Sequence, residues 1–227
     1  MTFRIMPPAA AAAAALAIAT PAHADDFQQW IGYSAKFDLS PKVSLQNETQ
    51  IRFSDDRNGL FQVQSSLLLG YKVSKDVSIA AGYLHSPNYT AGNFTTMERR
   101  AREQITFDNI AQLGKAKLGA RLRMEQRWRD DLDGTAWRVR PYAKVAIPLG
   151  NKEAPTLNLS EEVFFNLNTT GLQTKDGLER LRTAALVSIP LSKTIKLDTG
   201  YTHQHRFVTN RPNTDEHIFN LMANFSF

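Results

Sequence analysis

The chain has 227 residues, a formal net charge of +5 and no cysteine. Without cysteine it can form neither a disulfide framework nor a thiolate metal site. The small basic excess is spread along the chain among acidic residues, so we expect no nucleic-acid partner.

The first 24 residues are typical of a secretory signal peptide. Arg4 supplies a positive charge, 5–19 form an apolar stretch, and Ala22 and Ala24 are small residues at the positions that a signal peptidase reads. A buried alanine-rich helix is the alternative, but acidic residues follow at once. We therefore predict that 1–24 are a cleaved signal peptide and that 25–227 form one domain.

Beyond residue 24, apolar and polar residues alternate in successive runs. In the run 117–125, for example, Leu118 and Leu122 alternate with Arg121 and Arg123. A period of two places such arginines on one face of a strand, whereas a helix would spread them around its axis. No later segment has the roughly 20 apolar residues that a membrane helix needs, but a membrane β-strand needs only about 9 to 11 residues, of which every second one faces lipid.

The connections between the runs fall into two classes. Tight turns are predicted at 40–42, 74–76, 114–116 and 191–193, and longer loops at 55–59, 86–96, 129–134, 168–177 and 208–215. Short periplasmic turns that alternate with longer extracellular loops are typical of bacterial outer-membrane barrels. The segment 148–155 is longer than an ideal periplasmic turn.

This pattern predicts an all-β fold, a transmembrane antiparallel up-and-down β-barrel in the outer membrane of a Gram-negative bacterium. We count eleven runs, but bacterial single-chain barrels have even strand numbers. We therefore expect 10 or 12 strands, in which case either 27–39 does not fully span or one strand is split or missed.

The last run alternates Phe219, Leu221, Ala223, Phe225 and Phe227, and ends on the final residue. It resembles the C-terminal signature by which outer-membrane barrels are handed to the barrel-assembly machinery. An edge strand of a periplasmic protein is the alternative. We predict that Phe225 and Phe227 form an assembly signal and that this machinery is a partner during biogenesis.

The polar positions of the runs carry charges of both signs. A barrel of about ten strands encloses little more than side chains, so charges inside it must pair, which arginine does better than lysine. Two functions remain open, a polar plug that holds the shape of the barrel and a porin-like, narrow anion-selective channel or pocket for an acidic ligand. The predicted lumen network comprises Glu48, Arg52, Arg100, Arg102, Asp108, Arg121, Arg123, Glu125, Arg127, Arg138, Arg140, Lys144, Glu162, Arg180, Arg182, Asp198 and Arg206.

The pair Glu161-Glu162 breaks this pattern, because strict alternation turns one of the two carboxylates toward lipid. Such a charge near the membrane midplane costs up to a few kcal/mol. A β-bulge would rotate both inward, and we state this bulge as a hypothesis.

Several short motifs resemble a bacterial family known only as a domain of unknown function. They are the segments 27–30, 100–104, 121–127, 138–142 and 161–164. Members of that family look like outer-membrane barrels with repeated Arg-x-Arg and Glu-Gln positions on the lumen face. The resemblance implies this fold and no particular activity. An Asn-Glu pair of the family is matched here by Glu161-Glu162.

The histidines are the best candidates for an enzyme site. His203-Gln204-His205, which precedes Asn210, loosely resembles the His-x-Ser-Asn of lipid A deacylases, but His205 stands where the serine nucleophile is needed. Together with His217 these histidines could take up zinc or copper adventitiously, and no carboxylate clearly completes a site. We expect interfacial histidines that touch lipid and lipopolysaccharide headgroups, with no catalytic residue, no metal and no cofactor. A lipid-modifying enzyme is the less favoured alternative.

Overall fold

The computed structural model describes residues 26–151, 153–210 and 212–227, so the predicted signal peptide lies outside it. All regular structure in these residues is strand, and no helix among them could cross a membrane. The strands are β1 (Asp26–Asp38), β2 (Val43–Ser54), β3 (Gly59–Lys72), β4 (Val77–Thr90), β5 (Asn93–Leu113), β6 (Ala116–Arg129), β7 (Leu132–Pro148), β8 (Thr156–Asn166), β9 (Gly177–Pro190), β10 (Ile195–Arg206) and β11 (Thr214–Ser226).

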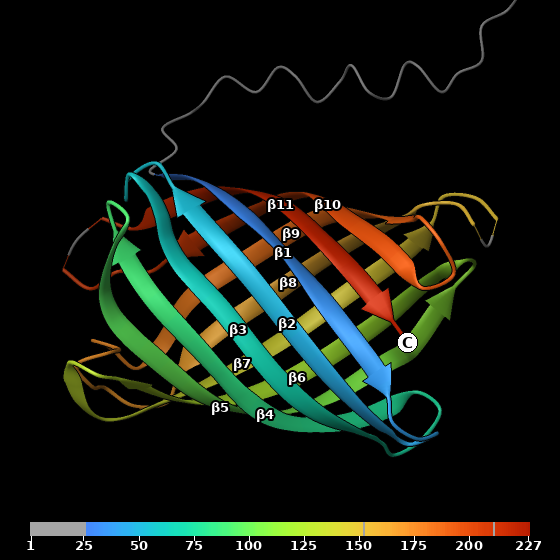
Figure 1. Ribbon diagram of the computed structural model, residues 1–227, viewed down its shortest axis with the longest axis horizontal. Coiled ribbons are helices and arrows are strands. Elements are labelled where there is room, and N and C mark those ends of the chain that lie inside the picture. Colours follow the sequence, from blue (N-terminus) through green and yellow to red (C-terminus); the bar gives the residue numbers. More distant parts are fainter. Residues whose placement is uncertain (1–25, 152, 211) are drawn as a thin grey trace, which may run out of the picture.

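The strands form one closed barrel in which each pairs with its neighbours in sequence, and β1 pairs with β11 (Figure 1). Ten of the pairs are antiparallel, but β1 and β11 are parallel, with Asp26 opposite Glu216 and Lys36 opposite Ser226. The expectation of an even strand number is therefore wrong, because a parallel pair lets an odd number of strands close. All eleven runs belong to the barrel, including 27–39.

Two ends of the barrel follow from this topology. The connections 55–58, 91–92, 130–131, 167–176 and 207–213 lie at what we call the loop end, and 39–42, 73–76, 114–115, 149–155 and 191–194 lie at the turn end. Because β1 and β11 run in the same direction, β1 begins at the loop end and the chain finishes at the turn end (Figure 1).

Two of the predicted long loops are shorter than expected. The strands β4 and β5 continue to Thr90 and Asn93, and β6 and β7 are joined by two residues only. Ala91 and Gly92 have φ angles of 48° and 77°, as in the type I′ turns that join hairpin strands through two residues. The predicted loops 86–96 and 129–134 are largely polar, and polar residues occur at strand ends as readily as in loops. The sequence alone therefore did not show how far these strands extend.

The seam between β1 and β11 is closed at the turn end by the last residue. The amide of Asp38 donates to the carbonyl of Phe227, and the amide of Phe227 donates to the carbonyl of Lys36, both at 2.9 Å. The rings of Phe37 and Phe227 stack with centroids 5.2 Å apart. Phe227 is thus part of the barrel wall.

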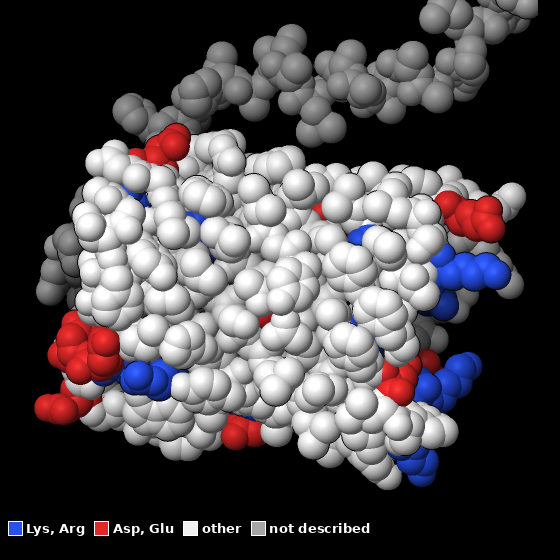
Figure 2. Space-filling model, viewed as in Figure 1, with Lys and Arg blue, Asp and Glu red and all other residues white. Residues whose placement is uncertain are grey.

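The two faces of the wall differ in chemistry. Large apolar side chains point outward, such as Leu67 and Leu69, which are 50% and 56% exposed. The middle of the face in Figure 2 is accordingly almost free of charge, and Lys, Arg, Asp and Glu gather toward the two ends. The inward face carries most of the buried charged and amide side chains.

The bulge predicted at Glu161-Glu162 is wrong. Both residues pair regularly with both neighbouring strands, Glu161 with Ala143 and Thr183, and Glu162 with Tyr142 and Arg182. Glu162 points into the lumen, and Glu161 lies on the outer face. There Glu161 accepts a hydrogen bond from the Thr183 hydroxyl at 2.5 Å, so a neighbouring side chain solvates the carboxylate without any change of register.

Candidate functional site: a charged lumen

Glu125 on β6 lies at the centre of the charge network and is 0% exposed. Its carboxylate is 2.6 Å from Nη2 of Arg138 and 2.7 Å from Nη1 of Arg140. Nε of Arg102 and Nη1 of Arg100 lie farther away, at 3.4 and 3.9 Å. Three strands, β5, β6 and β7, are thus linked through a single carboxylate, because alternation along each strand directs these side chains into the lumen.

Glu162 on β8 is a second such centre. Its carboxylate is 2.6 Å from Nη2 of Arg121, 2.7 Å from Nη2 of Arg140 and 3.3 Å from Nη1 of Arg182. Arg140 therefore bridges Glu125 and Glu162, and its planar fork can hold both because its nitrogens point in fixed directions.

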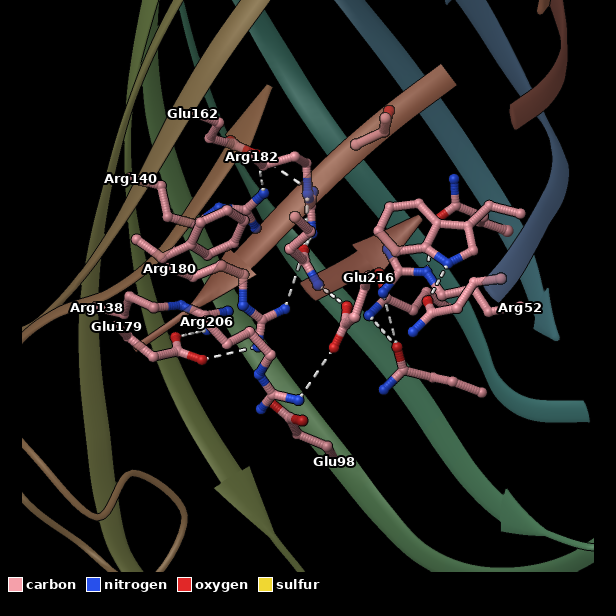
Figure 3. Close-up of a pocket in the computed structure, with 18 of the residues that line it drawn as sticks. Arg52, Glu98, Arg138, Arg140, Glu162, Glu179, Arg180, Arg182, Arg206 and Glu216 are labelled. Carbon is pink, nitrogen blue, oxygen red and sulfur yellow. Dashed lines mark hydrogen bonds and ion pairs between the residues drawn. The ribbon is translucent and has the colours of Figure 1, made fainter. Parts of the chain in front are cut away.

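Two further carboxylates nearer the loop end each join a pair of arginines. Figure 3 shows Glu179 between Arg138 and Arg180. The distances are 2.7 Å from Glu98 to both Arg100 and Arg127, 3.0 Å from Glu179 to Arg138, and 2.8 Å from Glu179 to Arg180.

Two aromatic rings inside the lumen are covered by guanidinium groups. The buried ring of Phe164 has four arginines around it, the nearest being Arg140 at 4.3 Å from the centroid. Trp30 lies against Arg52 at 3.8 Å and Arg182 at 4.8 Å. Such contacts are favourable because the face of the ring is electronegative, and they restrict where the arginines can move.

Not every buried arginine has a carboxylate. Arg52 donates to the side-chain oxygens of Gln50 and Gln62 at 2.7 and 2.9 Å. Arg123 donates to the Gln104 oxygen from Nε and Nη2, at 3.0 and 2.7 Å. Neither forms an ion pair with any residue that the structure describes. The lumen therefore holds positive charge that its own acidic residues do not neutralise.

The rim of the loop end behaves differently. Arg129 donates to Asp131 from Nε at 2.5 Å and from Nη2 at 3.0 Å, and this hydrogen bonding lowers the pKa of the Asp131 carboxyl. The pair is exposed to water, where such ion pairs contribute little to stability. The interior ion pairs are the ones that fix the shape of the lumen.

A family model described as a protein of unknown function, DUF2490, matches residues 27–215. The chain belongs to the DUF2490 family. It is also similar to an uncharacterized protein of Methylorubrum extorquens, with 26% identity over 180 residues that cover 79% of this chain and 78% of that protein. No solved structure matches the chain.

In this DUF2490 barrel most of the predicted lumen residues meet in ion pairs, but some do not. Arg52 and Arg123 bind glutamines, as described above. Glu48 lines the lumen and Asp108 lies near the turn end, and neither is ion-paired within the described part of the chain. The predicted residues in direct Arg–Glu contact are Arg100, Arg102, Arg121, Glu125, Arg127, Arg138, Arg140, Glu162, Arg180, Arg182 and Arg206.

Sequence reasoning missed several members of the network. Trp30, Glu98 and Phe164 all occupy inward positions, and their place in the alternation could have revealed them. Glu179 could not be found in this way. A register shift where β9 passes Phe164 and Phe165 puts Glu179 and Arg180, neighbours in sequence, in the same interior.

The candidate histidine site lies on the outer face near the loop end. His203 and His205 both contact Asp215, at 2.9 and 2.8 Å, and His217 bonds to the hydroxyl of Tyr201. Within the described residues no cluster of His, Asp and Glu has the arrangement of a metal site.

Two cavities occupy the lumen. The larger, about 1300 Å³, extends from the loop end, and the smaller, about 840 Å³, extends from the turn end. Among the described residues that line the larger cavity, fifteen are basic and nine are acidic. The network therefore lines the walls and leaves space between them, which a solid plug would not.

Proposed function

We propose that the protein is an integral β-barrel of the outer membrane of a Gram-negative bacterium, with a lumen that the Arg/Glu network keeps too narrow for general diffusion. The observation that carries this proposal is the inverted chemistry of the wall, apolar outside and charged inside. A soluble barrel of this size would have the opposite arrangement, with an apolar core and a polar surface.

The outer face supports a lipid environment on energetic grounds. Leaving one large aliphatic side chain in water instead of burying it costs about 1.5–3 kcal/mol, and this wall exposes such side chains on every strand from β1 to β5. A continuous apolar surface of this kind marks a membrane or an interaction surface. The shortest strand, β8, has 11 residues, enough for the about 9 to 11 that a tilted membrane strand needs.

The ion pairs inside the barrel support the proposal that the lumen is narrow. Buried carboxylates that each hold two or more arginines join strands across β5 to β9, and such contacts keep the guanidinium groups in place. The space in the lumen is divided into a larger and a smaller cavity that share only a few lining residues among those described, which favours a restricted lumen over the wide channel of a general porin. We therefore expect the reconstituted barrel to exclude sugars.

Membrane fractionation tests the proposal. The protein should float with outer-membrane vesicles, resist extraction at alkaline pH, and migrate faster on gels before boiling than after it. Liposomes that contain it should show no swelling in isotonic sugars, whereas a general porin reconstituted at the same density should swell. Recovery of the mature chain from periplasm as a monodisperse species without detergent would disprove the proposal.

The parallel seam predicts an unusual membrane topology. If the turn end faces the periplasm, β1 begins at the cell surface. A tag inserted between Ala24 and Asp25, or in the loop 167–176, should be labelled by antibody on intact cells. A tag in the turn 149–155 should be labelled only after the outer membrane is permeabilised. Labelling of the 149–155 tag on intact cells, with the other two protected, would mean that the orientation is reversed.

Deletion of Phe227 is expected to reduce assembly into the outer membrane, measured as the amount of heat-modifiable protein. Phe37→Ala is the matched control, because it removes the ring stacked on Phe227 and leaves the C-terminal residue in place. If Phe227 is an assembly signal, Phe37→Ala should assemble at near-normal levels. Normal levels in the deletion variant, or equal losses in both, would contradict that role.

A further inference from the structure

The two cavities of the lumen approach each other at a defined place. Only four residues of the described chain line both of them, Gln46, Arg121, Tyr142 and Lys144. We call this set the junction. Gln46 lies on β2, and Tyr142 and Lys144 lie on β7, which is five strands away around the ring in one direction and six in the other. Side chains from opposite walls therefore bound the place where the two cavities meet.

The two charged groups of the junction are both basic. Lys144 forms no hydrogen bond or ion pair with any described residue, and it pairs across the sheet with Gly119 and Ser160, which are too small to cover it. Its ammonium group is thus available to a solute.

Arg121 is positioned by two contacts. Its Nη2 is 2.6 Å from Glu162, and its guanidinium carbon lies 4.7 Å from the centroid of the Tyr142 ring. Glu162 is itself held by Arg140 and Arg182, so its charge is already balanced on the side of the larger cavity. The ring of Tyr142 and the guanidinium group therefore lie together where the two cavities meet.

The remaining wall is polar and uncharged. Gln46 donates from Nε2 to the Ser34 hydroxyl at 2.8 Å. Three carboxylates that form no ion pair within the described residues line one cavity each, Glu48 and Asp198 the larger and Asp108 the smaller. The Asp198 carboxylate accepts hydrogen bonds from Ser188 and Asn224. An anion that moves between the cavities would meet two positively charged side chains at the junction. A cation would meet the same two charges, and none of the four junction residues offers it a carboxylate.

We propose that the junction is the selectivity constriction of a narrow pathway for small inorganic anions such as chloride. This inference rests on the proposed function, since it requires a barrel that spans a membrane. The excess of fifteen basic over nine acidic residues in the larger cavity raises the local concentration of anions. Rings of Arg and Lys select anions in pores in the same way. Lys144 attracts the ion, Arg121 strips part of its water through hydrogen bonding, and Tyr142 sets the diameter.

The test uses the full mature protein in planar lipid bilayers under a tenfold KCl gradient. The wild-type protein should give small conductance steps and a reversal potential on the chloride side. Lys144→Glu should move the reversal potential toward the potassium side, and Lys144→Gln should give an intermediate value. Tyr142→Ala should raise the conductance several-fold while chloride stays the preferred ion.

Lys175→Glu is the matched control for charge. Lys175 lines the larger cavity at the loop end, away from the junction, so the same change of charge there should leave the reversal potential close to that of the wild type. Each variant is used only as protein with heat-modifiable mobility, which shows that the barrel has folded.

The outcomes separate the two proposals. If folded protein floats with membranes but neither the wild type nor Tyr142→Ala conducts, the anion pathway is wrong and the membrane barrel stands. The pathway is also wrong if Lys144→Glu shifts the reversal potential no more than Lys175→Glu does. If the protein does not associate with membranes at all, the proposed function fails first.

Discussion

Glu125→Ala is expected to destabilise the barrel more than any other single truncation in the lumen. Glu125 is fully buried and lies within 4 Å of nitrogens of Arg100, Arg102, Arg138 and Arg140. Removing one partner of a buried ion pair costs about 3–5 kcal/mol, because the other charge is left uncompensated. Here four arginines lose a carboxylate at once.

Urea unfolding of the lipid-reconstituted protein, followed by the loss of heat-modifiable mobility, measures this effect. Glu103→Ala is the matched control, because Glu103 lies on the outer face of β5 and its only side-chain hydrogen bond among the described residues is the one it accepts from the amide of Gln126, at 3.4 Å. We expect the free energy of unfolding to fall by several kcal/mol for Glu125→Ala. For Glu103→Ala we expect no loss, because this variant removes a carboxylate from the face that the proposal places in lipid. Equal losses in the two variants would show that the network does not hold the barrel together.

Arg138 shows how such a loss would spread. It contacts Glu125 at 2.6 Å and Glu179 at 3.0 Å, and it lies 5.1 Å from the Phe164 ring. Without Glu125 it can turn fully to Glu179, but Arg140 then keeps only Glu162, which already serves Arg121 and Arg182. The loss of stability in Glu125→Ala therefore involves arginines on several strands, and moving one side chain cannot relieve it.

Alternation alone predicts much of this site, because it depends only on the backbone period. It assigns Arg100 and Arg102 to one face of β5 and Glu125 to the same interior. Pair formation could not be predicted, since it depends on the stagger between neighbouring strands, which alternation leaves open. Thus Arg123 and Arg127 look equivalent in sequence, yet Arg127 binds Glu98 and Arg123 binds Gln104.

The parallel direction of the pair that closes the barrel could not be predicted from the sequence. Each hairpin can be recognised from two neighbouring runs and a turn, but the β1–β11 pair joins the two ends of the chain. Its direction follows from the number of strands, and one miscounted run would reverse it. The even-number rule for bacterial barrels therefore gave the wrong expectation, although the run 27–39 itself was recognised.

Leu122→Arg tests whether the wall faces lipid, and it is expected to have the second largest effect. Leu122 lies near the middle of β6, points outward and is 48% exposed. In a bilayer an arginine at the midplane of a barrel costs about 2–4 kcal/mol, and near the interface about 0–1 kcal/mol. In water the same substitution at an exposed position would change stability by less than about 0.5 kcal/mol.

Val73→Arg is the matched control, because Val73 is an exposed apolar residue in the connection at the turn end. Both variants are refolded into lipid vesicles and titrated with urea, and the difference between them is the quantity of interest. A membrane barrel should lose about 2–4 kcal/mol in Leu122→Arg and much less in Val73→Arg. If the two variants unfold at the same urea concentration as the wild type, the middle of the wall is not in contact with hydrocarbon. In water the two exposed positions would tolerate arginine equally well.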